Sequence, residues 1–302
     1  MTNIITEYPV KTLDGTELLP EGAELTEETL AELVKRNASV SYESLPLMDY
    51  GRVRQDLLIF INYSPYHIIF SDQEQNQDIL RILERVKLPL PVLESMEYFK
   101  QNDFQTYRHS LMVFIVSVLL AKVLLPDFKE LFSNTILGST HDIGKICLPL
   151  EILKKSTPLT KREHQHLKHH TAAGYVLLSY FLKDHESFIA KLARDHHERR
   201  DGSGYPRGIE QTDTMVEIVA VADVYDALLM PRSYRPISYD NRTALEEMTT
   251  MAERGEISWE VLKALIAQNR MEKPSYHDIV IPEEKRGKAP KGNLYGETIE
   301  ED

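Results

Sequence analysis

The sequence predicts a mainly α-helical protein with a small N-terminal α/β module. From about residue 95 to about residue 270, apolar side chains recur at the spacing of helix faces, with no strand pattern of comparable strength. Runs rich in β-branched and aromatic residues occur before about residue 90. Between these regions Pro89 and Pro91 interrupt the helical pattern and form a stiff boundary. We therefore divide the chain into residues 1–92, 93–272 and 273–302.

The first part combines strand and helix signals and is interpreted as a regulatory or sensory module. Asp14 and Gly15 lie between two short alternating runs and have the chemistry of a two-residue hairpin turn. Thr26 is expected to begin a short amphipathic helix that ends at Asn37. The remaining expected elements are strands at residues 56–63 and 66–70 and a helix at residues 72–86.

The second part is expected to be a helical catalytic domain, followed by a flexible tail. Its expected helices span residues 105–125, 131–143, 160–183, 186–199, 214–229, 241–253 and 257–269. The most apolar run, residues 111–125, includes Lys122 and is shorter than the roughly 18 to 20 residues that cross a bilayer. We interpret it as a buried helix. Residues 273–302 are polar and without periodicity, as in flexible tails.

The composition is typical of a soluble protein, for which we expect a cytoplasmic location. Hydrophobic residues make up 42% and charged residues 27% of the 302 residues. The first residues lack the positive and apolar regions of a secretory signal. Cys147 is the single cysteine, which excludes an intrachain disulfide. A net charge of −12 argues against a nucleic-acid surface, and we expect neither nucleic acid nor a membrane as partner.

The histidines of the helical region indicate a metal site. Nine of the 11 histidines fall between His109 and His197. His109 and His170 each share an apolar helix face, so both imidazoles are expected to point inward. The pair His196 and His197, at a helix-to-loop junction, is better explained by convergence on a metal than by one apolar face. The histidines interpreted as surface or supporting residues are His164, His166, His169 and His185.

Carboxylates complete the expected ligand set. His141 and Asp142 are adjacent, so that one offers a ligand and the other a carboxylate that can bridge two ions. Asp223 lies in an otherwise apolar helix, where a buried carboxylate needs a cation or strong donors. For Asp226, one turn later, a structural and a functional role remain equally open. The seven expected metal ligands are His109, His141, Asp142, His170, His196, His197 and Asp223.

This ligand set predicts two divalent ions and phosphoester chemistry. Five imidazoles and two carboxylates exceed what one tetrahedral ion uses, and nitrogen and oxygen ligation without thiolate suits iron, manganese, nickel or zinc. Two ions bridged by Asp142 and a hydroxide would form a clamp for attack on phosphorus. Lys145, three residues after Asp142, can place an ammonium against a phosphate oxygen as charge develops.

Three motifs together resemble one family. "HDIGK" at 141–145, "HHERRDGSGYP" at 196–206 and "ADVYDALLMPRSYR" at 222–235 are similar to the HD-GYP proteins. These are bacterial members of the HD metal-dependent phosphohydrolases that hydrolyse cyclic di-GMP. The resemblance covers roughly residues 95–270 and implies an HD-type helical bundle with phosphodiesterase activity. The implied products are the linear dinucleotide pGpG and, on further hydrolysis, GMP.

The resemblance also implies roles for individual residues. It assigns His109, His141, Asp142 and Asp223 to one metal, and Asp142 with His170, His196 and His197 to the second. Lys145, Arg232 and Arg235 take the positions of residues that contact the substrate phosphates. Tyr205, in the GYP loop, is expected at the pocket rim as a further substrate-binding residue. Iron and manganese are the favoured metals, and nickel and zinc are compatible.

One position departs from the family pattern. Members with a third metal usually carry a glutamate four residues before the first histidine, where this chain has Gln105. We therefore expect two ions, and pGpG is a possible end product in place of GMP. The sequence is also compatible with an HD phosphohydrolase for another nucleotide, and with a non-catalytic module that senses nucleotide or docks a diguanylate cyclase (GGDEF) partner through the GYP loop. A homodimer is compatible with the sequence as well.

Overall fold

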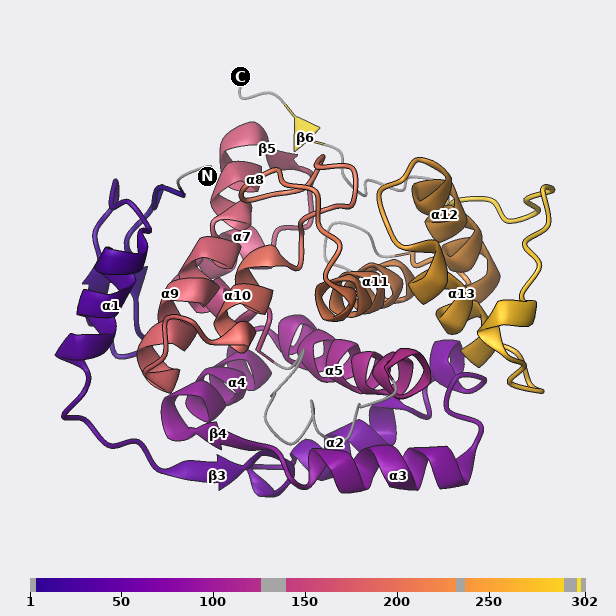
Figure 1. Cartoon of the computed structure of the whole chain (residues 1–302), viewed down its shortest axis with the longest axis horizontal. Coiled ribbons are helices and arrows are strands. Elements are labelled where there is room, and N and C mark those ends of the chain that lie inside the picture. The colour runs from indigo at the N-terminus through magenta and orange to yellow at the C-terminus, as the bar shows by residue number, and fades with distance from the viewer. Residues whose placement is uncertain (1–3, 126–139, 232–236, 291–297, 300–302) are drawn as a thin grey trace.

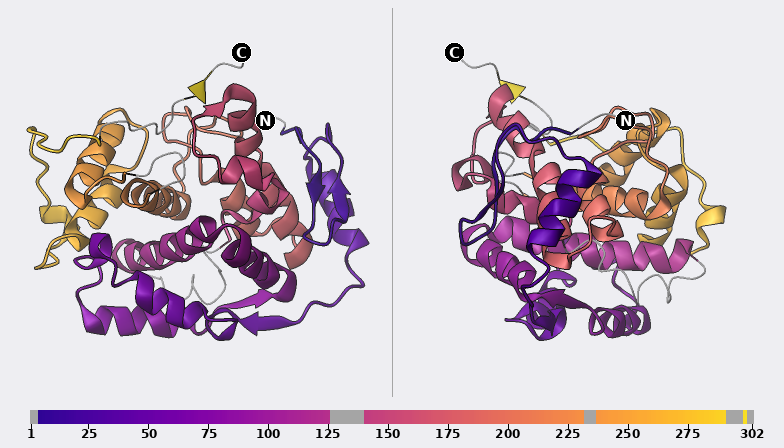
Figure 2. Two further views of the ribbon diagram at one scale, coloured as in Figure 1. Left: turned by 180° about the vertical axis from the view of Figure 1, so that it is seen from behind. Right: turned by 60° about the vertical axis from the view of Figure 1, so that its left-hand side comes forward.

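The computed structural model describes residues 4–125, 140–231, 237–290 and 298–299. It confirms the predicted class, a mainly helical protein with a few short strands. Figure 1 shows α5, Phe104–Leu124, crossing the middle of the molecule beneath α11, Thr214–Leu229. In Figures 1 and 2, α1 lies on one flank beside α9, and α12 and α13 form the opposite flank.

The N-terminal hairpin and first helix are confirmed. Strands β1, Val10–Lys11, and β2, Glu17–Leu19, pair antiparallel around Gly15, which has a φ of +85°. Helix α1, Glu27–Arg36, begins where the Thr26 side chain accepts a hydrogen bond from the amide of Thr29. Its buried Leu30 and Leu33 face the core, as the amphipathic pattern requires.

The two strands expected at residues 56–63 and 66–70 are wrong. The first of these segments overlaps α2, Val53–Phe60, and the second follows the 3₁₀ turn η2, Ser64–Tyr66. The buried positions of α2 are Val53, Leu57 and Phe60, which recur at helical spacing. The β-branched composition suggested strands, but the period of burial is that of a helix.

The other elements of the N-terminal module lead into the bundle. Helix α3, Gln73–Leu83, is confirmed, with Asp72 as its N-cap. A second sheet pairs β3, Ser44–Pro46, with β4, Lys87–Pro89, antiparallel. Helix α4, Leu90–Asn102, starts directly after β4 with a proline in its first turn, a position where proline is favoured. In the second part of the chain, the first expected helix began only at residue 105, because Pro91 was interpreted as part of a boundary.

The second part of the chain is the predicted helical bundle, but its helices are shorter than expected. The segment expected as one helix at 160–183 is two helices that meet at His169. Residues 140–142 form a turn that runs into η3, and residues 131–139 of the helix expected at 131–143 lie outside the described residues. The remaining helices are η3 (Ile143–Cys147), α7 (Leu150–Leu153), α8 (Lys161–Lys168), α9 (His170–Leu182), α10 (Phe188–Asp195), α12 (Asn241–Glu253) and α13 (Trp259–Gln268).

Helix α5 is the core of the bundle. It packs against α4, α11 and α13, and most of its side chains are buried. Among the described residues it is the one helix that is long and apolar enough, by length and composition, to cross a membrane, but 83% of its most apolar window is buried inside the protein. That burial supports the interpretation of the apolar run as a core helix.

Segments after α13 pack back onto the molecule. The 3₁₀ turn η4, Tyr276–Asp278, precedes the buried Ile279. Strand β6, Thr298–Ile299, pairs parallel with β5, Leu159–Thr160, just before α8. The domain boundaries at 92/93 and 272/273 stay predictions.

Candidate metal centre

The candidate centre begins where α5 and α11 face each other. His109 on α5 is 1% exposed. Its Nε2 lies 2.9 Å from Oδ1 of Asp223 on α11. Both helices are apolar around these positions, so their packing brings one imidazole and one carboxylate to the same buried point.

The turn that carries His141 and Asp142 lies against α9 because residue 144 is a glycine. A Cβ at Gly144 would lie 1.9 Å from the carbonyl oxygen of His170 and 2.5 Å from the amide nitrogen of Gly174. Glycine alone permits this approach. As a result Oδ1 of Asp142 lies 3.4 Å from Nε2 of His170.

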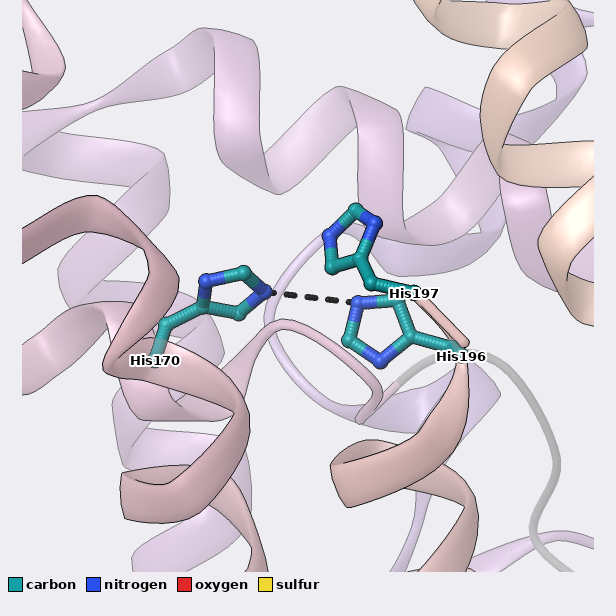
Figure 3. A group of neighbouring side chains, drawn as sticks. All are labelled: His170, His196 and His197. Atoms are coloured by element: carbon teal, nitrogen blue, oxygen red, sulfur yellow. Dashed lines mark hydrogen bonds between the residues drawn. The ribbon is translucent and has the colours of Figure 1, made fainter. Parts of the chain in front are cut away.

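Three histidines from two helices converge beside this turn, as Figure 3 shows. His170 is the first residue of α9, and His196 and His197 directly follow α10. The Nε2 atoms of His170 and His196 are 3.3 Å apart, the contact drawn as a dashed line. The ring of His197 lies 4.2 Å from that of His196 and 5.1 Å from that of His170, between centroids.

Asp142 lies between the two groups of histidines. Its Oδ2 is 3.6 Å from Nε2 of His109 and 3.4 Å from Nε2 of His141. Its Oδ1 instead faces His170. The two oxygens of one carboxylate therefore face different imidazoles, the arrangement that a carboxylate shared by two ions requires.

All seven expected ligands gather in one buried cluster. Three sets of potential donor atoms have all members within 4.8 Å of one another: His170, His196 and His197; His109, His141 and Asp223; His141, Asp142 and His196. Because His141 and His196 each belong to two sets, the sets form one continuous cluster. The cluster has donors enough for more than one ion.

Hydrogen bonds to the far ring nitrogens prepare the histidines for a metal. Nδ1 of His170 lies 2.6 Å from the carbonyl oxygen of Leu167, and Nδ1 of His196 lies 2.8 Å from that of Ala193. A carbonyl only accepts, so both Nδ1 atoms carry the proton and both Nε2 atoms present lone pairs. For one Nε2 to donate to the other, one ring would have to become a buried cation. A metal ion satisfies both lone pairs, and the residues therefore fit a metal.

The pKa values of the cluster favour neutral imidazoles and ionised carboxylates. Burial lowers the pKa of His170 to about 4, and it holds the pKa values of His196 and His197 well below their usual range. Burial alone would raise the pKa of Asp142, but the Lys145 ammonium and the imidazole of His141 hold it well below its usual range. Metals bind these protonation states.

A further carboxylate, Asp226, bonds the ring nitrogen of His109 that faces away from the cluster. It is 0% exposed, and its Oδ2 accepts a hydrogen bond from Nδ1 of His109 at 2.6 Å. Arg108 donates to both oxygens, at 3.0 Å and 2.7 Å, and the Tyr66 hydroxyl donates to Oδ1. Asp226 therefore orients the candidate ligand His109 and lies outside the three donor sets. The sequence left its role open.

Lys145 lies beside the cluster. Residues three apart are aligned in a 3₁₀ helix, and η3 brings Nζ of Lys145 to 2.6 Å from Oδ2 of Asp142. The ammonium is thus held at the carboxylate that lies between the two groups of histidines.

The GYP loop passes directly over the histidine pair. A Cβ at Gly204 would lie 2.4 Å from the carbonyl oxygen of His197, so a glycine is required there. The Tyr205 ring stacks on the His197 ring with centroids 4.6 Å apart, and Nζ of Lys168 lies 5.1 Å from the Tyr205 centroid. Tyr205 is half-buried beside His197, and its substrate role stays a prediction.

Glu198 anchors the same loop and was not predicted as a site residue. Its buried carboxylate accepts hydrogen bonds from the amides of Arg207 and Ile209, at 2.7 Å and 3.2 Å. The Arg207 guanidinium in turn donates to Asp195 at 2.8 Å. Burial raises the pKa of Glu198. These contacts fix the path of the loop and so the position of Tyr205.

The remaining predicted residues lie at the edge of the cluster or outside the described part of the chain. Gln105 is half-buried in the first turn of α5, one turn before His109. Arg232 and Arg235 lie outside the described residues, so their substrate role stays a prediction. Among the supporting histidines, His166 stacks on Tyr8 with ring centroids 3.4 Å apart.

Comparisons with known proteins point to one family. The family model described as "HD domain" matches residues 99–258, more than half of the chain. These residues contain the whole histidine and aspartate cluster. A protein of Thermotoga maritima named cyclic di-GMP phosphodiesterase is 38% identical over 149 residues, which cover 48% of this chain and 40% of that protein.

Two further relatives are similar to part of this chain. The cyclic di-GMP phosphodiesterase response regulator RpfG of Xanthomonas campestris is 46% identical over 97 residues, covering 32% of this chain and 26% of that protein. The 3'3'-cGAMP-specific phosphodiesterase 1 of Vibrio cholerae is 34% identical over 165 residues, covering 54% of this chain and 36% of that protein. The matched region spans less than half the length of each of these relatives.

Proposed function

The chain belongs to the HD domain family, and on this basis we propose that it is a metal-dependent phosphodiesterase that hydrolyses cyclic di-GMP. The observation that carries the proposal is the cluster in which the two oxygens of Asp142 face different histidines. The relatives named cyclic di-GMP phosphodiesterases support the choice of substrate.

We propose that the seven residues hold two divalent ions, with Asp142 between them. His109, His141, Asp142 and Asp223 would hold one ion, and Asp142, His170, His196 and His197 the other. When bound, such ions supply an activated water as nucleophile and stabilise charge on the phosphate. The ligands favour iron or manganese and are compatible with nickel or zinc. Gln105 favours two ions over three.

The chain's own residues complete the site. Once Asp142 acts as a ligand, the Lys145 ammonium is available to donate to a non-bridging phosphate oxygen as its charge grows. Tyr205, stacked on His197 at the edge of the cluster, is proposed as a further substrate contact. Arg232 and Arg235 are proposed to contact the phosphates. Linear pGpG is the first expected product, with GMP following if the second ester is cleaved.

A second candidate substrate is another cyclic dinucleotide. The relative named 3'3'-cGAMP-specific phosphodiesterase 1 aligns over 54% of this chain, which supports a mixed cyclic dinucleotide as the second candidate. Comparing turnover of cyclic di-GMP and 3'3'-cGAMP by one protein sample separates the two candidates. We also propose a cytoplasmic location, a homodimer and docking of a diguanylate cyclase through the GYP loop as working hypotheses.

Product analysis tests the proposal. Protein loaded with Mn²⁺ or Fe²⁺ should convert cyclic di-GMP to pGpG, seen by chromatography, and His141→Ala and Asp142→Ala should abolish turnover. A metal-loaded, folded wild-type sample that cleaves neither cyclic dinucleotide would rule out the proposed cyclic dinucleotide phosphodiesterase activity. Binding of a diguanylate cyclase that survives these substitutions would indicate a docking role separate from catalysis.

A further inference from the structure

The carboxylate of Asp226 joins three segments that are distant in sequence. Its Oδ2 accepts from His109 Nδ1 at 2.6 Å and from Arg108 Nη2 at 2.7 Å, and its Oδ1 accepts from Arg108 Nη1 at 3.0 Å and from the Tyr66 hydroxyl. His109 and Arg108 belong to α5 and Asp226 to α11, but Tyr66 belongs to the N-terminal module. The network therefore connects that module to a proposed metal ligand.

Tyr66 is held so that its hydroxyl reaches this carboxylate. The side chain is 0% exposed. The amide of Tyr66 donates to the carbonyl of Tyr63 at 2.8 Å, and its own carbonyl accepts from the amide of Phe70 at 3.0 Å. Its ring meets the ring of Tyr225 edge-on, 6.3 Å between centroids. The turn at 63–70 thus places the Tyr66 side chain in the interior of the helical domain.

We propose that Tyr66 is a positioning residue for the metal centre, and that it couples the N-terminal module to metal binding. The hydrogen bond from His109 to Asp226 fixes the ring orientation that presents Nε2 to the cluster, and such supporting bonds tune metal affinity. Tyr66 and Arg108 together fix the carboxylate that makes this bond. The inference rests on the metal centre of the proposed function.

The coupling has to act in both directions. If the Tyr66 hydroxyl strengthens metal binding, then bound metal stabilises the Tyr66 contact by the same free energy. Metal should therefore slow local opening of the turn at 63–70. Conversely, a signal that moves this turn in the N-terminal module would weaken metal binding without touching a ligand.

Tyr66→Phe tests the inference, because it removes only the hydroxyl. We expect about tenfold weaker Mn²⁺ affinity, measured by competition with a chelator. In the wild type, Mn²⁺ should slow hydrogen exchange of the Phe70 amide, and this slowing should shrink in the variant. Tyr225→Phe is the matched control: it is equally buried and lies beside Tyr66, but its hydroxyl bonds Asn241 and Asn269, both at 2.9 Å.

The outcomes separate coupling from general loosening. Tyr66→Phe with wild-type Mn²⁺ affinity overturns the inference, and so does an equal loss of affinity in Tyr66→Phe and Tyr225→Phe. If Mn²⁺ does not change the hydrogen-exchange rate of the Phe70 amide in the wild type, the inference is also overturned, and this test needs no variant. A folded wild type that binds no Mn²⁺ overturns the metal centre as well, whereas wild-type binding with an unaffected Tyr66→Phe overturns the coupling alone.

Discussion

At residue 144, a hydrogen atom in place of a side chain decides how closely the turn with His141 and Asp142 approaches α9. We predict that Gly144→Ala lowers the free energy of unfolding by about 3 kcal/mol or more, because its Cβ would meet the backbone of His170 at 1.9 Å. Any folded fraction should bind Mn²⁺ more weakly, since Asp142 and His170 would be forced apart. Chemical unfolding and metal titration measure the two effects.

Gly174 provides the matched control on the opposing helix. A Cβ there would meet its nearest atom, Cβ of Ala193, at an ordinary 3.4 Å. We expect Gly174→Ala to stay within about 1 kcal/mol of the wild type, because helix propensity favours alanine. If Gly144→Ala were as harmless as Gly174→Ala, the close approach would not be what sets the geometry of the site.

Lys145 is predicted to act on the substrate and not on the metal. Lys145→Ala should lower kcat by about 10²- to 10³-fold, the usual effect of removing a group that stabilises transition-state charge. Mn²⁺ affinity should not fall, because the ammonium has a charge of the same sign as the ion and gives up Asp142 when that carboxylate binds the ion. Steady-state kinetics measure the change in kcat. The control is Lys154→Ala, which replaces an exposed lysine at the end of α7. Unchanged kcat in Lys145→Ala would contradict the role.

The limits of sequence reasoning are visible at single residues. Each expected ligand has a local signal, either an apolar helix face around His109 and His170 or an adjacent pair such as His141 with Asp142. Tyr66 and Arg108 have no such signal, because their partner Asp226 is 160 and 118 residues away. Only the packing of α5 against α11 and the N-terminal module reveals that network.

At the scale of elements, helical periodicity predicted most helices correctly, and residue composition led to wrong predictions for two helices. Long apolar faces identified α5, α9 and α11, and a capping threonine identified α1. Helix α2 was mistaken for a strand because its exposed positions include Leu58 and Ile59, which mask the helical period. Helix α4 was missed because a proline in its first turn suggested a break. Pairing of β3 with β4 is a long-range contact that no local pattern contains.

One lysine after the end of α13, Lys273, connects this part of the chain to the N-terminal module by hydrogen bonds. Nζ of Lys273 donates to the carbonyls of Ile68 and Ile69, at 2.6 Å and 3.2 Å, and to that of Gln268. Lys273→Met should lower the free energy of unfolding by about 1–3 kcal/mol, because partly buried carbonyls lose their donor. Denaturant titration measures the loss.

Lys285 supplies the comparison for this fastening. Its exposed ammonium bonds Thr250 at 2.8 Å and Glu253 at 2.5 Å, so Lys285→Met should cost less than about 1 kcal/mol. Equal costs for the two lysines would mean that Lys273 does not join the two parts of the chain.

For the whole molecule, the proposed metal centre is also a structural link. Its ligands come from α5, the turn before η3, α9, the end of α10, and α11, so bound ions would join five segments of the bundle. Mn²⁺ at about one hundred times its dissociation constant should add about 2.7 kcal/mol per bound ion to the free energy of unfolding, and a chelator should remove this gain. Thermal unfolding with and without chelator measures this.

The same experiment on Asp142→Ala gives the control. Loss of the bridging carboxylate should abolish most of the metal-dependent rise in unfolding temperature. Equal unfolding temperatures of the wild type in chelator and in Mn²⁺ would show that the cluster does not hold ions in the folded protein.

The central claim is that Asp142 lies between two ions in this cluster, and the most direct measurement is anomalous X-ray scattering from crystals of the Mn²⁺-loaded protein. We predict two manganese peaks, one beside each oxygen of Asp142, the first near His109, His141 and Asp223 and the second near His170, His196 and His197. A cluster without peaks, or manganese bound elsewhere on the molecule, would contradict it.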